Sequence, residues 1–254
     1  MGRKRSRKFW EARAMDEPGV GELLLYGEIG DYTWWGDEVT PRQFKEDLDA
    51  LGDISELRVF INSPGGDVFA GQAIYSILRR HKAKVSVYVD GIAASAASLI
   101  AMAGDRIVMP HNAMLMIHNP WTLAAGDANH FLEVAEALDK VRDAMIAVYE
   151  EQTGLGKDEI VALLDAETWM TAAEAIELGF ADGIEEAKQV AASVAGKGKL
   201  LINGLVVDLT QYQNPPKVLV AKQEQEPPPD NRLRLLSVEL ELLTGSNLRR
   251  NEND

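Results

Sequence analysis

The sequence predicts an α/β fold with a mostly parallel sheet. Short apolar runs typical of buried strands alternate with segments in which apolar residues recur at helical spacing. This order of strand, turn and helix occurs repeatedly, which is typical of βαβ units with right-handed crossovers. The 254 residues and the 46% hydrophobic content are ample for a sizeable core.

The first half of the chain supplies three of these units. Pro41 suits the first turn of a helix that Thr40 caps, and a strand ends shortly before the glycine pair at 65–66. In order, we expect a strand at 23–29, a helix at 40–51, a strand at 57–61, a helix at 68–78, a strand at 85–90 and a small-residue helix at 93–103.

The second half adds strands and a long amphipathic helix. Gly154 is expected to stop the long helix, and Thr171 with Glu174 forms a capping-box pattern. In order, we expect strands at 106–109 and 113–117, followed by helices at 127–152, 158–164 and 171–179.

The composition divides the chain into four parts. The basic start predicts a disordered arm over 1–20, followed by the main domain over 21–185. A small extension over 186–222 is expected to contain a hairpin, because the Asn-Gly pair at 203–204 favours a tight turn. A Pro-rich linker and a tail are expected over 223–254, and the apolar segment at 233–243 could form a partner-binding helix.

Charge and composition argue against several classes of function. The 26 Lys and Arg against 40 Asp and Glu give a net charge of -14, which argues against nucleic acid as a partner. The chain has no cysteine, so we expect no disulfide and no thiolate metal site, and we assign no metal or cofactor. No apolar run approaches the roughly 18 residues of a membrane span, so we expect a cytoplasmic protein without a membrane partner.

Three short motifs indicate acyl-transfer chemistry. Residues 61–67 contain a glycine pair that can present backbone amides, Ser95 stands where a strand passes into a helix, and His118 follows another strand. The helix start favours negative charge beside the Ser95 oxygen. Together these are the parts of a serine hydrolase, namely a nucleophile, a general base and an oxyanion hole.

Spacing alone leaves a second serine open as nucleophile. Ser98 lies one helical turn beyond Ser95 and is the internal alternative. His118 is the best placed of the four histidines, because the other three lie in predicted turns or on the long helix.

The three motifs in this order resemble those of the Clp protease proteolytic subunit family. They read Ile-Asn-Ser-Pro-Gly-Gly from residue 61, Gly-x-Ala-Ala-Ser from residue 91 and Met-Ile-His-x-Pro from residue 116, and the likeness runs from about 23 to 184. The resemblance implies a stack of βαβ units of the crotonase type with a long handle-like helix. It also implies that Ser95 is the nucleophile, that His118 is the base, and that the amides of Gly66 and Ala96 form the oxyanion hole.

The third catalytic position departs from the family pattern. The family has an aspartate where this chain has Glu167, and a glutamate can still accept the imidazole N–H although its extra methylene changes the approach. Asp165 is a nearby substitute, and the choice between the two stays open here.

The basic start and the long C-terminal part resemble the phage branch of the family, the head maturation or prohead proteases. That resemblance implies ATP-independent cleavage of capsid or scaffold proteins in the host cytoplasm or the procapsid. The apolar stripe of the helix at 127–152 predicts a homo-oligomeric ring. The alternatives are a housekeeping-type Clp peptidase that works with an ATPase unfoldase, and a non-proteolytic crotonase-like enzyme or inactive scaffold protein. A lysine-based site is disfavoured, because His118 fits its motif and no lysine does.

Overall fold

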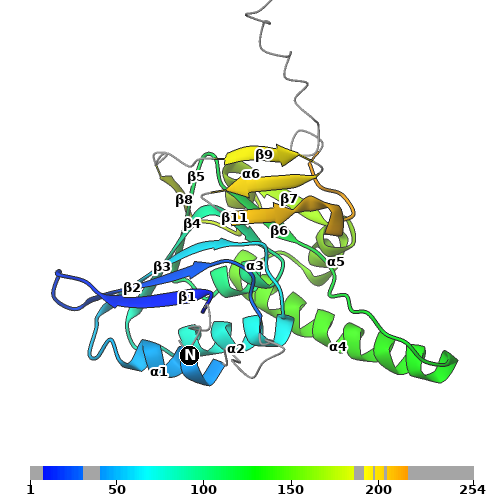
Figure 1. The fold of residues 1–254 in the computed structure, drawn as a ribbon, viewed down its shortest axis with the longest axis horizontal. Coiled ribbons are helices and arrows are strands. Elements are labelled where there is room, and N and C mark those ends of the chain that lie inside the picture. Colours follow the sequence, from blue (N-terminus) through cyan, green and yellow to red (C-terminus); the bar gives the residue numbers. More distant parts are fainter. Residues whose placement is uncertain (1–7, 31–40, 186–191, 197, 203–204, 217–254) are drawn as a thin grey trace, which may run out of the picture. The chain divides into compact units, whose positions relative to one another are not determined.

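The fold is a mixed α/β structure around one large sheet, as the sequence predicted (Figure 1). The computed structural model describes residues 8–30, 41–185, 192–196, 198–202 and 205–216. The strands of the large sheet are β1 (Trp10–Ala14), β2 (Val20–Tyr26), β3 (Glu56–Ser63), β4 (Lys84–Ala94), β5 (Arg106–Pro110), β6 (Met114–Ile117), β7 (Thr168–Thr171) and β8 (Gly183–Glu185). The helices are α1 (Pro41–Asp49), α2 (Val68–Arg79), α3 (Ala96–Ala101), α4 (Ala128–Thr153), α5 (Lys157–Asp165) and α6 (Ala172–Glu177).

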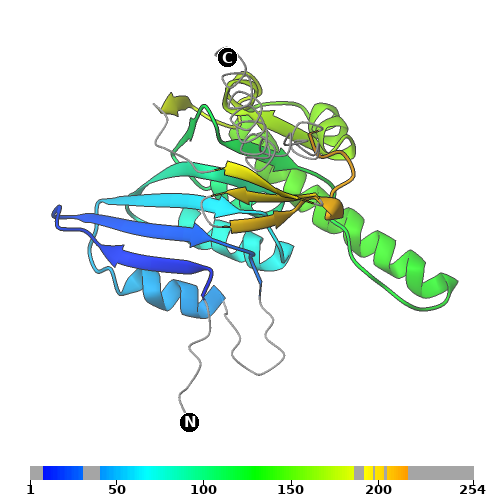
Figure 2. The ribbon, with the colours of Figure 1, turned by 45° about the horizontal axis from the view of Figure 1, so that its top comes forward.

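Most neighbouring strands of this sheet are parallel. The order is β1-β2-β3-β4-β5-β8, with β6 pairing with β4 and β7 pairing with β6. Only β1 against β2 and β7 against β6 run antiparallel among the described strands of the large sheet. Helices α1 and α2 lie along one face of the first strands in both ribbon views (Figures 1 and 2).

Strand β4 pairs with two strands in succession, and this pairing determines where the candidate site lies. Residues 86–88 pair with β5, whereas residues 92–94 pair with β6. The strand therefore runs to Ala94, past its expected end at residue 90, and α3 is shorter than the expected helix at 93–103. Because β4 and β6 are parallel, their carboxyl ends lie at the same edge of the sheet.

The expected disordered arm over 1–20 does not hold for Trp10–Ala14, which form β1 antiparallel to β2. The physical reason is the aromatic pair at its start. Trp10 is buried, its ring packs edge-on against Phe9 and Phe44 at centroid distances of 4.9 and 5.4 Å, and its Nε1 donates to Asp47 at 2.8 Å. Burial of two aromatic side chains outweighs the basic character of the segment.

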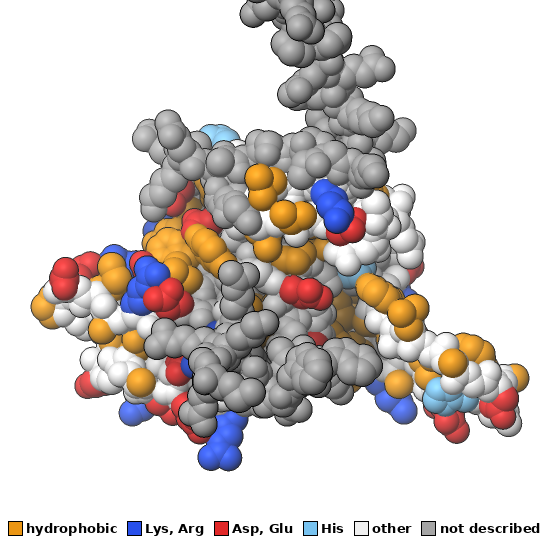
Figure 3. All heavy atoms as spheres, in the orientation of Figure 1, with side chains coloured by type: hydrophobic (Ala, Val, Ile, Leu, Met, Phe, Trp, Pro, Cys, Tyr) orange, Lys and Arg blue, Asp and Glu red, His pale blue; other side chains and the backbone are white. Residues whose placement is uncertain are grey.

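Helix α4 is buried at one end and exposed at the other. Asp127 caps its start and Gly154, with φ +72°, ends it, close to the bounds expected from the sequence. Met145 lies in the C-terminal, buried half, whereas Phe131 and Leu132 are 51% and 66% exposed near the N-terminal end. Hydrophobic side chains are visible along this projecting part (Figure 3).

The extension that follows the main domain forms a second, three-stranded antiparallel sheet. Its elements are β9 (Ala192–Gly196), β10 (Lys199–Ile202), β11 (Leu205–Asp208) and the 3₁₀ helix η1 (Leu209–Gln211). The expected hairpin is β10 with β11, and its Asn-Gly turn lies outside the described residues. The extension packs its apolar side chains on Ile92, Ala94 and Met116 of the large sheet.

A close backbone contact fixes this packing. Asn62 Nδ2 donates to the carbonyl oxygen of Ile202 at 3.2 Å, and a Cβ on Gly91 would lie 2.3 Å from Ile202 Cγ2. Glycine at position 91 therefore lets the extension approach β4 directly. The linker and tail expected over 223–254 lie outside the described residues. In the described part of the chain, no helix combines the length and the apolarity that crossing a bilayer requires.

Candidate active site

Ser95 occupies a strained position between β4 and α3. Its backbone has φ +54° and ψ −126°, a region that residues other than glycine rarely adopt. Its N–H donates to the carbonyl oxygen of Met116 on β6 at 2.9 Å, which secures the turn. Such strain persists only where the surrounding structure enforces it, and it is concentrated at functional sites.

His118 meets Ser95 directly. Its Nε2 lies 2.7 Å from Ser95 Oγ, within hydrogen-bond distance. The contact follows from the topology, because the pairing of Ala94 with Met116 leaves the next residues of both strands at the same sheet edge. Burial lowers the pKa of His118 below its usual 6.5, and the charge of Glu167 partly opposes this shift. The imidazole is therefore neutral at pH 7 and able to accept a proton.

The glycine pair lies against Ser95. Gly65 and Gly66 have φ of +94° and +143°, and a Cβ on Gly65 would lie 2.6 Å from Ser95 Cβ and 3.0 Å from the Ala96 nitrogen. Over the described ranges, no backbone carbonyl accepts from the amides of Gly66 or Ala96. Both predicted oxyanion donors thus flank the residue whose oxygen would attack.

Glu167 is a buried acid, 5% exposed, with φ +49°. Its Oε2 accepts from the Gln213 amide at 2.7 Å, and its Oε1 accepts from the Asn214 amide at 2.7 Å and from Trp169 Nε1 at 3.2 Å. Within the described part of the chain it makes no direct hydrogen bond with His118, and it acts on that imidazole through its charge.

The two alternatives left open by the sequence point elsewhere. The side chain of Asp165 is 56% exposed and accepts from Asn119 Nδ2 at 2.8 Å and from Arg142 at 2.6 Å. Ser98 is fully buried, and its Oγ donates to the carbonyl oxygen of Ser95 at 2.6 Å and lies 2.8 Å from the hydroxyl of Tyr149. Among the described residues, neither side chain makes a hydrogen bond with His118.

The sequence analysis missed Tyr212. Its hydroxyl donates to the carbonyl oxygen of Pro64 at 2.9 Å, and its ring lies edge-on to His118 and Trp169 at centroid distances of 6.3 and 5.2 Å. No local motif marks this residue, because it reaches the site only through the folding of the extension.

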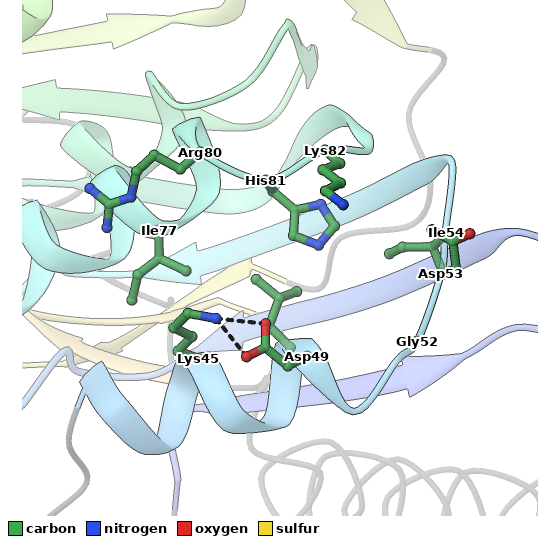
Figure 4. Close-up of a pocket in the computed structure, with 10 residues that line it drawn as sticks. Lys45, Asp49, Gly52, Asp53, Ile54, Ile77, Arg80, His81 and Lys82 are labelled. Carbon is green, nitrogen blue, oxygen red and sulfur yellow. Dashed lines mark hydrogen bonds and ion pairs between the residues drawn. The ribbon is translucent and has the colours of Figure 1, made fainter.

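A hollow on the surface lies away from this site. Its volume is about 460 Å³, and it lies between α1 and the C-terminal end of α2, whereas the N-terminal end of α2 begins beside Gly66 (Figure 4). Lys45 and Asp49 form an ion pair on its wall, and His81 also lines it. The hollow contains none of the catalytic candidates.

Comparison with known proteins agrees with the geometry. The sequence model of the Clp protease family matches residues 46–188, more than half of the chain. The chain belongs to the Clp protease family. Its enzyme class is accordingly that of a serine-type peptidase.

Two curated relatives of this Clp protease family member carry the name ATP-dependent Clp protease proteolytic subunit, and both come from strains of Bacteroides fragilis. Each is 34% identical over 140 residues, which is 54% of this chain. The matched part covers 67% of one relative and 63% of the other. Strands β9, β10 and β11 and residues 212–214, which reach the candidate site, lie beyond the part that matches the family.

Proposed function

We propose that this Clp family peptidase is an ATP-independent serine endopeptidase that cleaves capsid or scaffold proteins during phage head maturation. The observation that supports its chemistry most strongly is the 2.7 Å contact between Ser95 Oγ and His118 Nε2 beside two available amides. That arrangement contains a nucleophile, its base and an oxyanion hole.

The proposed reaction is acyl transfer. Ser95 Oγ attacks the scissile carbonyl carbon while His118 Nε2 takes its proton, and the amides of Gly66 and Ala96 receive the developing oxyanion. His118 then gives the proton to the leaving amine as the C–N bond breaks. A water, deprotonated by His118, cleaves the acyl-enzyme and returns Ser95 to its starting state.

Glu167 is the proposed third member of the site. In this role its charge stabilises the imidazolium that forms during each step, and the direction of its effect on the pKa of His118 supports the assignment. Asp165 is excluded from this role in our proposal, because it pairs with Arg142 and Asn119.

The proposed assembly is a ring of identical subunits joined through α4. The exposed apolar side chains near its N-terminal end support this, and Trp121 and Leu123 in the preceding loop, 61% and 90% exposed, extend the same apolar surface. A protease packaged with its substrate has a high effective concentration and needs no unfoldase.

A second candidate is a housekeeping-type peptidase that depends on an ATPase, and the name of both Bacteroides fragilis relatives favours it. Co-expression with the capsid gene from the same genome, followed by intact mass measurement, separates the two. We expect capsid cleavage without an ATPase, and none with Ser95→Ala. Intact capsid protein, together with rapid degradation of an unfolded substrate once a Clp ATPase is added, would support the second candidate instead.

A further inference from the structure

The segment just after η1 contacts Glu167, the ring of His118 and Pro64, which precedes the glycine pair. We propose that residues 212–214 are a built-in positioning element, in which the amides of Gln213 and Asn214 hold the Glu167 carboxylate beside His118 and Tyr212 ties the element to the oxyanion turn. This inference rests on the proposed function of the same site, and it assigns a positioning role to a segment outside the part that matches the family.

The carboxylate contacts are the first support. Each oxygen of Glu167 accepts one backbone amide at 2.7 Å, a length typical of charge-assisted hydrogen bonds. The side chains of Gln213 and Asn214 are exposed, so the backbone path rather than the side chain at position 213 makes the contact. Two backbone amides that donate to one buried carboxylate fix its orientation.

Tyr212 is the second support. It is 9% exposed, and it connects Pro64, which directly precedes the two glycines, with the rings of His118 and Trp169. A single side chain therefore spans the oxyanion turn, the base and the strand that follows the acid. Such a bridge maintains the spacing between groups that must act together.

The anchoring of the extension is the third support. Leu200, Ile202, Val207 and Leu209 are buried against the ends of β4 and β6, the two strands that deliver Ser95 and His118. The positioning element is therefore attached to the same sheet edge as the nucleophile and the base. A glutamate is longer than the aspartate of the family pattern, and the two amides supply the restraint that its extra methylene requires.

The element has a consequence for pH dependence. Glu167 is the group whose charge raises the pKa of His118, against the lowering by burial. Tyr212, which packs against the same imidazole, stays neutral because burial raises its pKa to about 12. Loss of the amide hydrogen bonds that keep Glu167 near His118 should therefore lower the pKa of His118 further. The acid side of the pH profile of Ser95 labelling should then shift to lower pH.

The test uses the rate at which a fluorophosphonate labels Ser95 in the full-length protein, measured from pH 4 to pH 9, because this probe needs no knowledge of the substrate. Gln213→Pro removes the amide proton, whereas the matched control Gln213→Ala keeps it. Proline is compatible with the preceding residue, since Tyr212 has extended backbone with ψ 150°. Glu167→Gln serves as the reference for loss of the charge.

We expect Gln213→Ala to be labelled at the wild-type rate, and Gln213→Pro to be labelled on the order of 10²-fold more slowly. The pH at which the labelling rate of Gln213→Pro is half-maximal should shift toward that of Glu167→Gln. Equal pH profiles of the labelling rate for Gln213→Pro and Gln213→Ala would overturn the proposal. Slower labelling of both variants without a shift of the pH midpoint would also overturn it. If Gln213→Pro fails to fold, Tyr212→Phe decides: slower labelling supports the bridge and an unchanged rate refutes it. A wild type that is not labelled at Ser95 would instead refute the proposed function itself.

Discussion

The variant Ser98→Ala separates structural support of Ser95 from the proposed catalytic step. The Ser98 hydroxyl donates to the carbonyl oxygen of Ser95, so the hydroxyl of Tyr149 is left to donate to Ser98. Both side chains are fully buried, and burial raises the pKa of the Tyr149 phenol, which keeps it protonated. The substitution removes the acceptor of Tyr149 and the donor to the Ser95 carbonyl oxygen while leaving Ser95 in place.

The expected loss of stability in Ser98→Ala follows from the Tyr149 hydroxyl, which keeps no hydrogen-bond acceptor. A buried polar group without a partner costs about 1–3 kcal/mol, which corresponds to roughly 2–4 °C in Tm for each kcal/mol in a domain of this size. Tyr149→Phe should cost less, about 0.5–1.5 kcal/mol, because Ser98 keeps its bond to Ser95. In the double variant no hydroxyl is stranded, so its loss should be smaller than the sum of the two single losses.

The assay combines denaturant unfolding of the four proteins with the rate of fluorophosphonate labelling. Ser98→Ala should label within roughly tenfold of the wild type, because Ser98 touches no reacting atom. Ser95→Ala serves as the inactive control. Loss of labelling in Ser98→Ala at unchanged stability would refute the reasoning and make Ser98 the nucleophile. Additive losses in the double variant would refute the hydrogen-bonded pair.

Three further predictions follow from the same geometry. Gly66→Ala should abolish peptidase activity, because a Cβ there would lie 1.9 Å from the Ile29 carbonyl oxygen at a φ of +143°, and circular dichroism will show whether the damage stays local. Glu167→Gln should slow peptide hydrolysis strongly and Asp165→Asn only slightly, and the reverse ranking of rates would transfer the role to Asp165. Phe131→Asp should reduce the mass seen by light scattering without reducing the Tm of the subunit, because this side chain is 51% exposed, and an unchanged assembly would count against a ring joined through α4.

Much of the fold could be predicted from local patterns. The long helix is an example, because its capping aspartate and its terminal glycine are both local signals. The predicted end of β4 was wrong, because residues 91–94 are small and their pattern is typical of the start of a helix. Their pairing with β6 is a long-range contact that local patterns do not indicate. Strand β7 was missed for the same reason, since its partner β6 lies about fifty residues earlier in the chain.

In the candidate site, too, local motifs predict one part and long-range packing forms the other. The contact between Ser95 and His118 could be predicted, because parallel strands bring their carboxyl ends together and short motifs mark both residues. The carboxylate environment could not, because its donors are backbone amides at 213 and 214, and every residue except proline carries such an amide. Only the packing of the extension brings them to Glu167.

The most direct test of the central claim is identification of the residue that a fluorophosphonate modifies, by peptide mass mapping of the full-length protein. We predict one adduct, on Ser95, that is absent in Ser95→Ala and forms several orders of magnitude more slowly in His118→Ala. An adduct on another residue, or one that persists in Ser95→Ala, would contradict the account.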